Sequence, residues 1–512
     1  MLIGFLIRLS LFLLEPLVSP DGLGYTESGI NLLSGKGYVN ALGDFRGQLE
    51  PLYPIFIGLA DLLVRDPTVS GAFVSVIFGS LLLWPLLRFC EAAYDRKTAY
   101  VASVIIVVYP YLVNYASKAL TEATYTFFLF SAAWWGWLAF RRGRTFDFAM
   151  CGAFAGLAYL TRFEIVGYLL AYLIFVLVAS RGSRWKQSLI LAAIFVALVA
   201  PFHVYNWYHT GSPMLLGRFQ KGLSYQVEIH KLGPLDSPWS SFFGNPVQFA
   251  QRYIKGVGIA YTEYLPTLFP PLLIAITGAG LIELLRRGVF GFSELYLGAI
   301  IAVTLFGYPL LRPGGRNLTV ALPFLVVLLA KGITEIGPVI AAYLPAIRHR
   351  AASATAIAWA LTAIVCVSVL PQTYRPLLLG PDTLAPTELM EMGKWIRARF
   401  THRPVLLTNR RQVAFYARTP SVMLMSNVYD DIVREAWAKG IQYVVLASHG
   451  GPTAVEWYLL EKQIQNSADL RLIHQITRGS NWVHLYEVDG VTGSANSARL
   501  TEPAGATSAS LR

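Results

Sequence analysis

The chain has 512 residues, of which 55% are hydrophobic and only 14% are charged. A soluble protein of this length needs far more charge to cover its surface, so the composition excludes an ordinary soluble protein. The formal net charge of +12 is concentrated in short loops between apolar runs. That distribution is typical of membrane proteins and argues against nucleic-acid binding.

The first apolar run covers residues 2–18, and no small-residue cleavage site follows it. We therefore expect a retained membrane helix rather than a signal peptide. A long loop at 19–67 comes next, and its apolar piece Leu52–Val64 is too short to cross about 30 Å of hydrocarbon. Ten further runs predict spans near residues 68–88, 98–116, 122–140, 147–161, 164–180, 187–206, 262–285, 294–311, 317–331 and 351–370. We expect a polytopic α-helical membrane protein with about eleven transmembrane helices.

Basic residues collect in the loops on one side of these spans. The loops carry Arg88, Arg96 and Lys97; Arg141, Arg142 and Arg144; Arg181, Arg184 and Lys186; Arg286 and Arg287; and Arg348 and Arg350. The fifth loop lies on the same side as the other four if residues 332–350 form an interfacial loop. The positive-inside rule makes this side cytoplasmic. An odd number of spans then places the loops 19–67 and 207–261 and everything after residue 370 outside.

The region after residue 370 has shorter apolar segments. Apolar pieces of strand length predict strands at 405–407, 422–425, 443–447, 470–476 and 482–488, and they alternate with helical stretches at 388–399, 430–439 and 454–465. We expect a membrane domain at 1–370, a small external α/β domain at 371–489, and a disordered tail at 490–512. No glycine-rich phosphate loop accompanies the strands, so dinucleotide binding is unsupported.

Four carboxylates, Asp21, Glu50, Glu122 and Glu164, lie beside the outer ends of the spans. Each of these acids, and the charged residues beside them, can also have a purely structural role. Asp21 can be a helix N-cap, and Glu122 can be a first-turn residue favoured by the helix dipole. Arg162 can simply pair with Glu164 at the interface. Such acids at one rim also suggest a surface at which an enzyme works.

The rim residues belong to an ordered series of short motifs. Asp21 follows the first span, and "LLSGKGY" (32–38) and "PLYP" (51–54) come next. Further along are "YDRKTAYVASVIIVVYP" (94–110), "SKALTEATYTFFLF" (117–130), "GAFAGLAYLTRFE" (152–164), "APFHVYNWYHTGSPM" (200–214) and "GRNLTVALPFLVVLLA" (315–330). In order and spacing this series resembles the lipid-carrier-dependent glycosyltransferases of the GT-C fold, in the protein O-mannosyltransferase and aminoarabinose transferase group.

This chain departs from that family at three positions. The family pairs its first-loop Asp with a second acid where Gly22 stands here. Where the family has an Arg-Tyr pair at the start of a late span, this chain has Arg316-Asn317. Phe163 stands where the family commonly has a Pro after the Arg of the fifth span. These departures leave the donor sugar and any use of a metal open.

The resemblance implies an enzyme that moves a sugar from a polyprenyl-phosphate carrier to an acceptor hydroxyl at the outer face, with inversion. The acceptor can be a glycan, a lipid or a protein, and membrane lipids surround the enzyme, which we expect in a bacterial inner membrane with its C-terminal domain periplasmic. The implied catalytic residues are Asp21, as general base, and Glu122. The implied phosphate-binding residues are Arg162, Arg316, Arg312 and Lys118, and the substrate-binding residues are Tyr25, Glu50, Tyr53 and Glu164.

Several alternatives remain open at this stage. Lys118 can extend its ammonium to the lipid headgroups, and Tyr25 and Tyr53 can belong to an aromatic belt at the interface. His203, His209 and His230 have no metal-ligand spacing, so no metal residue is assigned. A transporter of a lipid-linked precursor is the main rival function. Transporters, however, place ionisable groups near the bilayer midplane, whereas most charges here lie at span ends.

Overall fold

A computed structural model describes residues 1–14, 16–47, 49–211, 246–311, 315–343, 351–374, 386–424, 426, 428–448, 460, 462–464, 468–479 and 481–490. The chain divides into two compact units. The first contains Met1–Pro16, Gly24–Asn40 and Phe45–Leu378, and the second contains Leu17–Leu23, Ala41–Asp44 and Leu379–Arg512.

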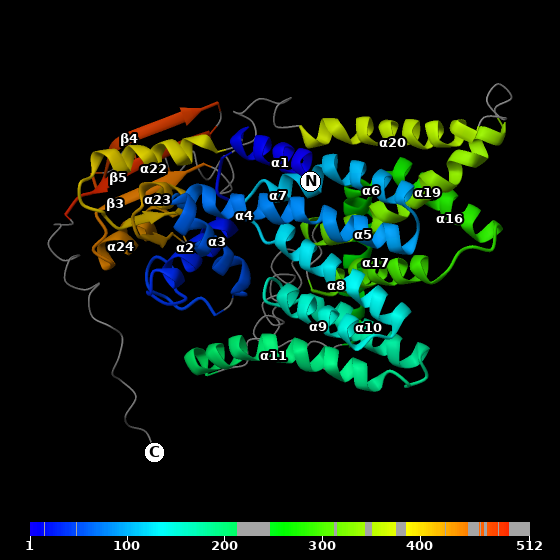
Figure 1. The fold of residues 1–512 in the computed structure, drawn as a ribbon. Coiled ribbons are helices and arrows are strands. Elements are labelled where there is room, and N and C mark those ends of the chain that lie inside the picture. The colour runs from blue at the N-terminus through cyan, green and yellow to red at the C-terminus, as the bar shows by residue number, and fades with distance from the viewer. Residues whose placement is uncertain are drawn as a thin grey trace, which may run out of the picture. The chain divides into compact units, whose positions relative to one another are not determined.

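The first unit is a bundle of helices (Figure 1). They are α1 (Leu2–Leu14), the greater part of α2 (Pro20–Leu33), α3 (Leu52–Val64), α4 (Pro67–Leu81), α5 (Leu83–Ala93), α6 (Arg96–Val108), α7 (Pro110–Ala116), α8 (Glu122–Arg142), α9 (Thr145–Tyr159), α10 (Ile165–Ala179), α11 (Trp185–Thr210), α14 (Pro246–Ile259), α15 (Leu265–Leu268), α16 (Pro271–Arg286), α17 (Phe292–Leu311), α18 (Gly315–Leu318), α19 (Leu322–Tyr343) and α20 (Ala351–Thr373). A π-helical turn, Ala260–Tyr264, precedes α15, and a 3-10 turn, Thr319–Ala321, precedes α19.

The predicted spans all contain helix, but their lengths differ. Within the described ranges, four helices are long and apolar enough to cross a membrane: Pro67–Ala93, Trp185–Thr210, Gly315–Tyr343 and Ala354–Thr373. Two bent pairs raise this number to six if each pair is one span. The pair α6 and α7 bends by 58° at Tyr109, because Pro110 disfavours helical backbone in the residue before it. The exact count of about eleven spans therefore stays a prediction.

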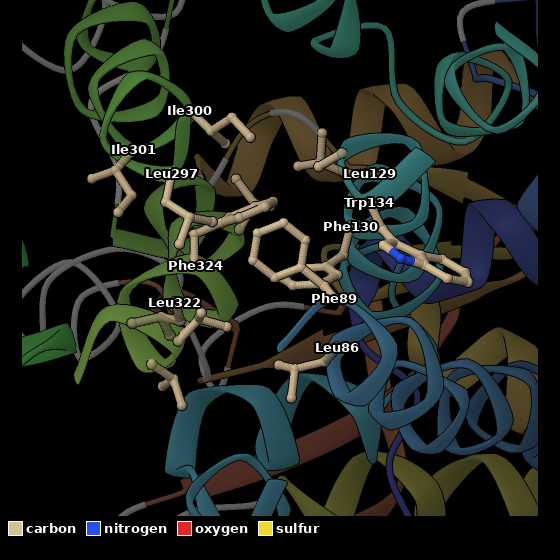
Figure 2. Packing of buried hydrophobic residues seen from close by; sticks show 14 of the residues in the cluster. Leu86, Phe89, Leu129, Phe130, Trp134, Leu297, Ile300, Ile301, Leu322 and Phe324 are labelled. Carbon is tan, nitrogen blue, oxygen red and sulfur yellow. The ribbon is translucent and has the colours of Figure 1, made fainter. Parts of the chain in front are cut away.

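Helix α8 lies inside the bundle, where it packs against α4, α5 and α9 (Figure 1). Aromatic rings join it to its neighbours. The Phe130 ring stacks on that of Phe324 from α19, with centroids 4.8 Å apart, and meets Phe89 from α5 edge to face at 5.8 Å (Figure 2). All three side chains are buried. This core holds the middle of α8, the helix that begins at Glu122.

The segment 19–67 is not only a loop, as the sequence led us to expect, because it contains helix α2. Ser19 caps this helix: its hydroxyl oxygen accepts a hydrogen bond from the Gly22 amide at 3.1 Å. A tertiary contact then supports α2. A methyl group added to Gly29 would lie 2.1 Å from the Pro54 carbonyl oxygen of α3, and one added to Gly58 would lie 2.5 Å from the Gly29 carbonyl oxygen. The two helices cross at these glycines.

The second unit is built on a five-stranded sheet in the order β2-β1-β3-β5-β4. The strands are β1 (Leu406–Thr408), β2 (Ser421–Met423), β3 (Tyr443–Ala447), β4 (Leu470–Arg478) and β5 (Asn481–Val488). Strand β1 pairs in parallel with β2 and β3, whereas β3–β5 and β5–β4 are antiparallel. All five predicted strands are confirmed, with ends that differ by up to two residues.

Helices cover both faces of this sheet. Val444 and Leu446 of β3 share a core with α24 (Tyr429–Ala438), and the alternate residues of β3 share another with α22 (Thr387–Arg399) and α23 (Arg411–Ala417). Such a strand is apolar throughout because neither face meets water. The predicted helices at 388–399 and 430–439 are confirmed, whereas the short α23 was not predicted. The predicted helix at 454–465 falls mostly outside the described residues, as does the predicted tail.

The close approach of α16 and α19 gives a test of packing. A methyl group on Gly280 would lie 2.1 Å from the Cα of Gly332, whereas one on Gly278 of the same helix meets nothing within 4 Å. We expect Gly280→Ala to lower the free energy of unfolding by roughly 1–3 kcal/mol, because backbone must shift. Gly278→Ala should leave it unchanged or raise it by up to about 1 kcal/mol. Thermal unfolding in detergent measures both, and equal melting temperatures would contradict this contact.

Candidate active site

Five side chains from three parts of the first unit form one polar cluster: Glu122, Arg162, Glu164, Arg316 and Asn317. Arg162 is its centre. Its Nη1 donates to Glu122 Oε1 at 3.0 Å, and its Nη2 donates to Glu164 Oε1 at 2.8 Å and to Asn317 Oδ1 at 2.9 Å. Arg316 Nε also contacts Glu122 Oε1. A single carboxylate oxygen therefore binds two guanidinium groups.

Local structure explains how each member reaches the cluster. Glu122 is the first residue of α8, where the helix dipole favours an acid. Arg162 lies in the turn that ends α9, with its amide donating to the Ala158 carbonyl at 2.8 Å. Arg316 and Asn317 belong to the short helix α18. The cluster thus joins the start of α8, the α9–α10 turn and α18.

Burial makes these ion pairs strong and the cluster asymmetric. The side chains of Glu122, Arg162 and Glu164 are 3%, 13% and 13% exposed, whereas that of Arg316 is 34% exposed. The guanidinium of Arg162 also lies 5.7 Å from the ring centroid of Tyr125, which adds a cation–π contact. Arg316 is therefore the more accessible of the two arginines for an anionic ligand.

An apolar cavity of about 270 Å³ is lined in part by the helix that follows Glu164. It lies between α8, α9, α10 and α17, and its lining includes Ile165 and Tyr168, which follow Glu164 by one and four residues. The Tyr168 hydroxyl bonds to Thr304 on α17 at 2.8 Å, so it is not left unpaired beside the apolar space. The start of α10 therefore links the two features, because Glu164 of the cluster is followed directly by Ile165 of the cavity wall.

Asp21 belongs to the second unit. It is exposed and occupies the second position of α2, after Ser19 and Pro20. Because Ser19 is the capping residue, the alternative that Asp21 is the N-cap is wrong. The segment Leu17–Leu23 is held within this unit by a bond of 2.8 Å from the Val18 amide to the Tyr416 hydroxyl. The catalytic role of Asp21 stays a prediction.

The remaining predicted substrate residues lie in the first unit. Tyr25 and Tyr53 meet edge to face with ring centroids 5.4 Å apart. Tyr53 is fully buried, and its hydroxyl contacts the Gly71 carbonyl and Ser75. Glu50 is 3% exposed, directly before α3. Contact of these residues with a substrate stays a prediction.

Two predicted phosphate ligands have different outcomes. Lys118 is half-buried in the turn before α8, four residues from Glu122, and its phosphate contact stays a prediction. Arg312 falls outside the described residues.

Of the histidines considered as metal ligands, His230 also falls outside the described residues. His203 bonds to the Tyr159 hydroxyl at 2.7 Å. No group of three potential metal ligands occurs in the part of the chain that is described.

Sequence reasoning missed Asn317. It stands where the resembled family has a tyrosine, and we treated it only as a departure. The structure gives it a partner, because its side-chain Oδ1 accepts a hydrogen bond from Arg162. Its position next to Arg316 was the only available signal.

Comparison with known proteins finds a matching family model and similar folds. The family model of dolichyl-phosphate-mannose-protein mannosyltransferase matches residues 50–207, which include Glu122, Arg162 and Glu164. The chain is similar to the structure of ArnT from Cupriavidus metallidurans bound to undecaprenyl phosphate, with 12% sequence identity and a TM-score of 0.61. The match covers 98% of each chain. The fold is that of the GT-C membrane glycosyltransferases.

A second GT-C structure agrees. The oligosaccharyltransferase AglB from Archaeoglobus fulgidus, in complex with an inhibitory peptide and a dolichol-phosphate, is 14% identical with a TM-score of 0.57. The match covers 94% of this chain and 73% of that protein. No curated protein matches the chain by sequence. The predicted resemblance to GT-C enzymes is confirmed, and so is the fold class of an apolar helical region followed by a small sheet domain.

The buried carboxylate at the centre of the cluster gives a second test. We expect Glu122→Gln to lower the free energy of unfolding by about 3–5 kcal/mol, because it leaves two guanidinium groups without their shared anion. Glu91→Gln is the matched control. Glu91 pairs with Arg88 at 3.2 Å, but the Arg88 side chain is 55% exposed, so the loss should be about 0–1 kcal/mol. Denaturant unfolding in micelles measures both, and a similar loss for the two variants would refute the role of burial.

Proposed function

We propose that this protein transfers a sugar from a polyprenyl-phosphate carrier to an acceptor hydroxyl at the outer face of the membrane, with inversion at the anomeric carbon. The supporting observation is the junction of the polar cluster and the apolar cavity at the start of α10. Arg162 and Arg316 offer guanidinium groups to a phosphate, and the cavity beginning at Ile165 offers space to a prenyl tail. The two GT-C structures with bound polyprenyl phosphates support the same ligand class.

Helix α8 supports the assignment of the reaction to the outer face. Glu122 begins this helix and Arg141 and Arg142 end it. Its 21 residues measure about 30 Å, close to the thickness of the hydrocarbon core, although α8 is not one of the four helices that are apolar enough to cross a membrane. The basic end is cytoplasmic by the positive-inside rule, so the polar cluster belongs at the opposite surface.

The reaction is a single displacement. The Asp21 carboxylate takes the proton of the acceptor hydroxyl, and the acceptor oxygen forms a bond to the anomeric carbon. The bond between that carbon and the phosphate oxygen breaks, and its electron pair leaves with the phosphate. A phosphate is a good leaving group at neutral pH, so no general acid is required. Arg316 and Arg162 stabilise the negative charge that develops on the departing phosphate.

Asp21→Asn tests the base. Asn has the same size and cannot accept the proton, so we expect turnover to fall by roughly 100-fold or more. Affinity for the donor should persist, because the base contacts the acceptor. The measurement is sugar transfer from synthetic polyprenyl-phosphate sugars by purified protein, with melting temperature as the folding control. Asp44→Asn, another exposed acid of the same outer segment, should retain full activity. Near-normal transfer by Asp21→Asn would remove Asp21 as the base.

Arg316→Ala tests the phosphate site. Hydrogen bonds to charged groups contribute about 1.5–3 kcal/mol, so the KM for the donor should rise roughly 10- to 100-fold. Arg316→Lys should recover only part of this, because an ammonium lacks the two-pronged donor geometry of a guanidinium. Arg286→Ala changes an arginine whose side chain is 76% exposed in a basic loop, and it should leave the KM unchanged. An unaltered KM in Arg316→Ala would exclude Arg316 from phosphate binding.

A further inference from the structure

The first helix carries a buried charge that the proposed reaction does not yet use. Arg8 lies in the middle of α1, and its side chain is fully buried. Its Nη1 donates to the Gly4 carbonyl at 2.9 Å. Its Nε and Nη2 are buried and have no hydrogen-bond partner among the residues that the structure describes. A charged side chain within an apolar helix of a membrane protein is rare, and it usually faces a functional interior with a specific partner.

The surrounding residues are shaped to admit this guanidinium. A methyl group added to Gly79 of α4 would lie 3.0 Å from Arg8 Nε, and one added to Gly4 would lie 3.1 Å from Arg8 Nη1. A side chain at either glycine would therefore press on the Arg8 head group. The two glycines provide the space in which Arg8 is held.

Arg8 shares a small cavity with the polar cluster. The cavity has a volume of about 10 Å³, and both Arg8 and Glu122 line it, together with residues of α4, α7 and α8. Glu122 uses Oε1 to bind Arg162 and Arg316, whereas its Oε2 is buried and has no hydrogen-bond partner within the described ranges. A volume of about 10–15 Å³ with two or more polar neighbours suits one ordered water molecule.

We propose that Arg8 is a positioning residue for the carrier-phosphate site and acts through Glu122, to which one buried water molecule joins it. This proposal rests on the proposed function. Glu122 and Glu164 balance the charges of Arg162 and Arg316, so the polar cluster alone is neutral. Arg8 adds one positive charge behind Glu122. It thereby holds the carboxylate that orients both arginines, and it leaves the site with a net charge of +1 for an arriving phosphate.

A double-mutant cycle tests the link. The variants are Arg8→Met, Glu122→Gln and both together, and the probe is undecaprenyl phosphate, whose dissociation constant is measured with purified protein in nanodiscs. We expect Arg8→Met to weaken binding by roughly 5- to 30-fold. In the Glu122→Gln background the same change should weaken it by less than about twofold, because residues that act through one another are not additive. Arg8→Lys should recover part of the affinity. Arg88→Met, which removes an exposed arginine, should have no effect.

The outcomes separate this proposal from the proposed function. If the wild type fails to bind undecaprenyl phosphate, the proposed function fails. The link between Arg8 and Glu122 is then read from the melting temperatures of the same four proteins without ligand, where a non-additive effect supports it and additive shifts overturn it. If the wild type binds, unchanged affinity in a folded Arg8→Met overturns the role of Arg8. An equal loss in both backgrounds overturns its action through Glu122. If Arg8→Met does not fold, Arg8→Gln, which also removes the charge, replaces it in the cycle with the same criteria.

Discussion

The buried charge of Arg162 is the constraint on which the membrane unit depends. A guanidinium removed from water is costly unless carboxylates and other acceptors surround it. Here Glu122, Glu164 and Asn317 together satisfy it. These three residues come from the start of α8, the start of α10 and helix α18, so the bundle must bring those points together whenever it buries Arg162. The same contacts place Arg316 beside Glu122, at a position open enough to meet a ligand.

In the proposed function, the cluster and the cavity divide the recognition of an amphipathic donor. Guanidinium groups recognise a phosphate by charge and geometry, whereas the cavity along α10 and α17 recognises only apolar bulk. Both features are needed at one place, because a lipid phosphate offers both within one molecule. The second unit holds the segment Leu17–Leu23, which carries Asp21, through the bond between Val18 and Tyr416 of α23.

The sequence predicts those features that depend on local patterns. Apolar length located the helices, and apolar pieces of strand length located all five strands, including β3, whose unbroken apolar run reflects burial on both faces. The pair of Arg162 and Glu164 was foreseen because only one residue separates them. Helix α2 was missed because its glycine-containing sequence has weak helical preference and is supported by the crossing of Gly29 and Gly58 with α3. The meeting of Arg162 with Asn317 joins residues 155 positions apart, and no local pattern carries that information.

The central claim is that one site holds the carrier's phosphate at the polar cluster and its tail in the adjoining cavity. Photo-crosslinking tests it most directly, with an undecaprenyl phosphate that bears a diazirine in its first isoprene units. After irradiation of the protein in nanodiscs, mass spectrometry identifies the labelled peptides. The account predicts labels on α10 and α17 near Ile165 and Val303, which line the cavity, and their loss in Arg316→Ala. Labels confined to other helices, or unchanged labelling in Arg316→Ala, would contradict it.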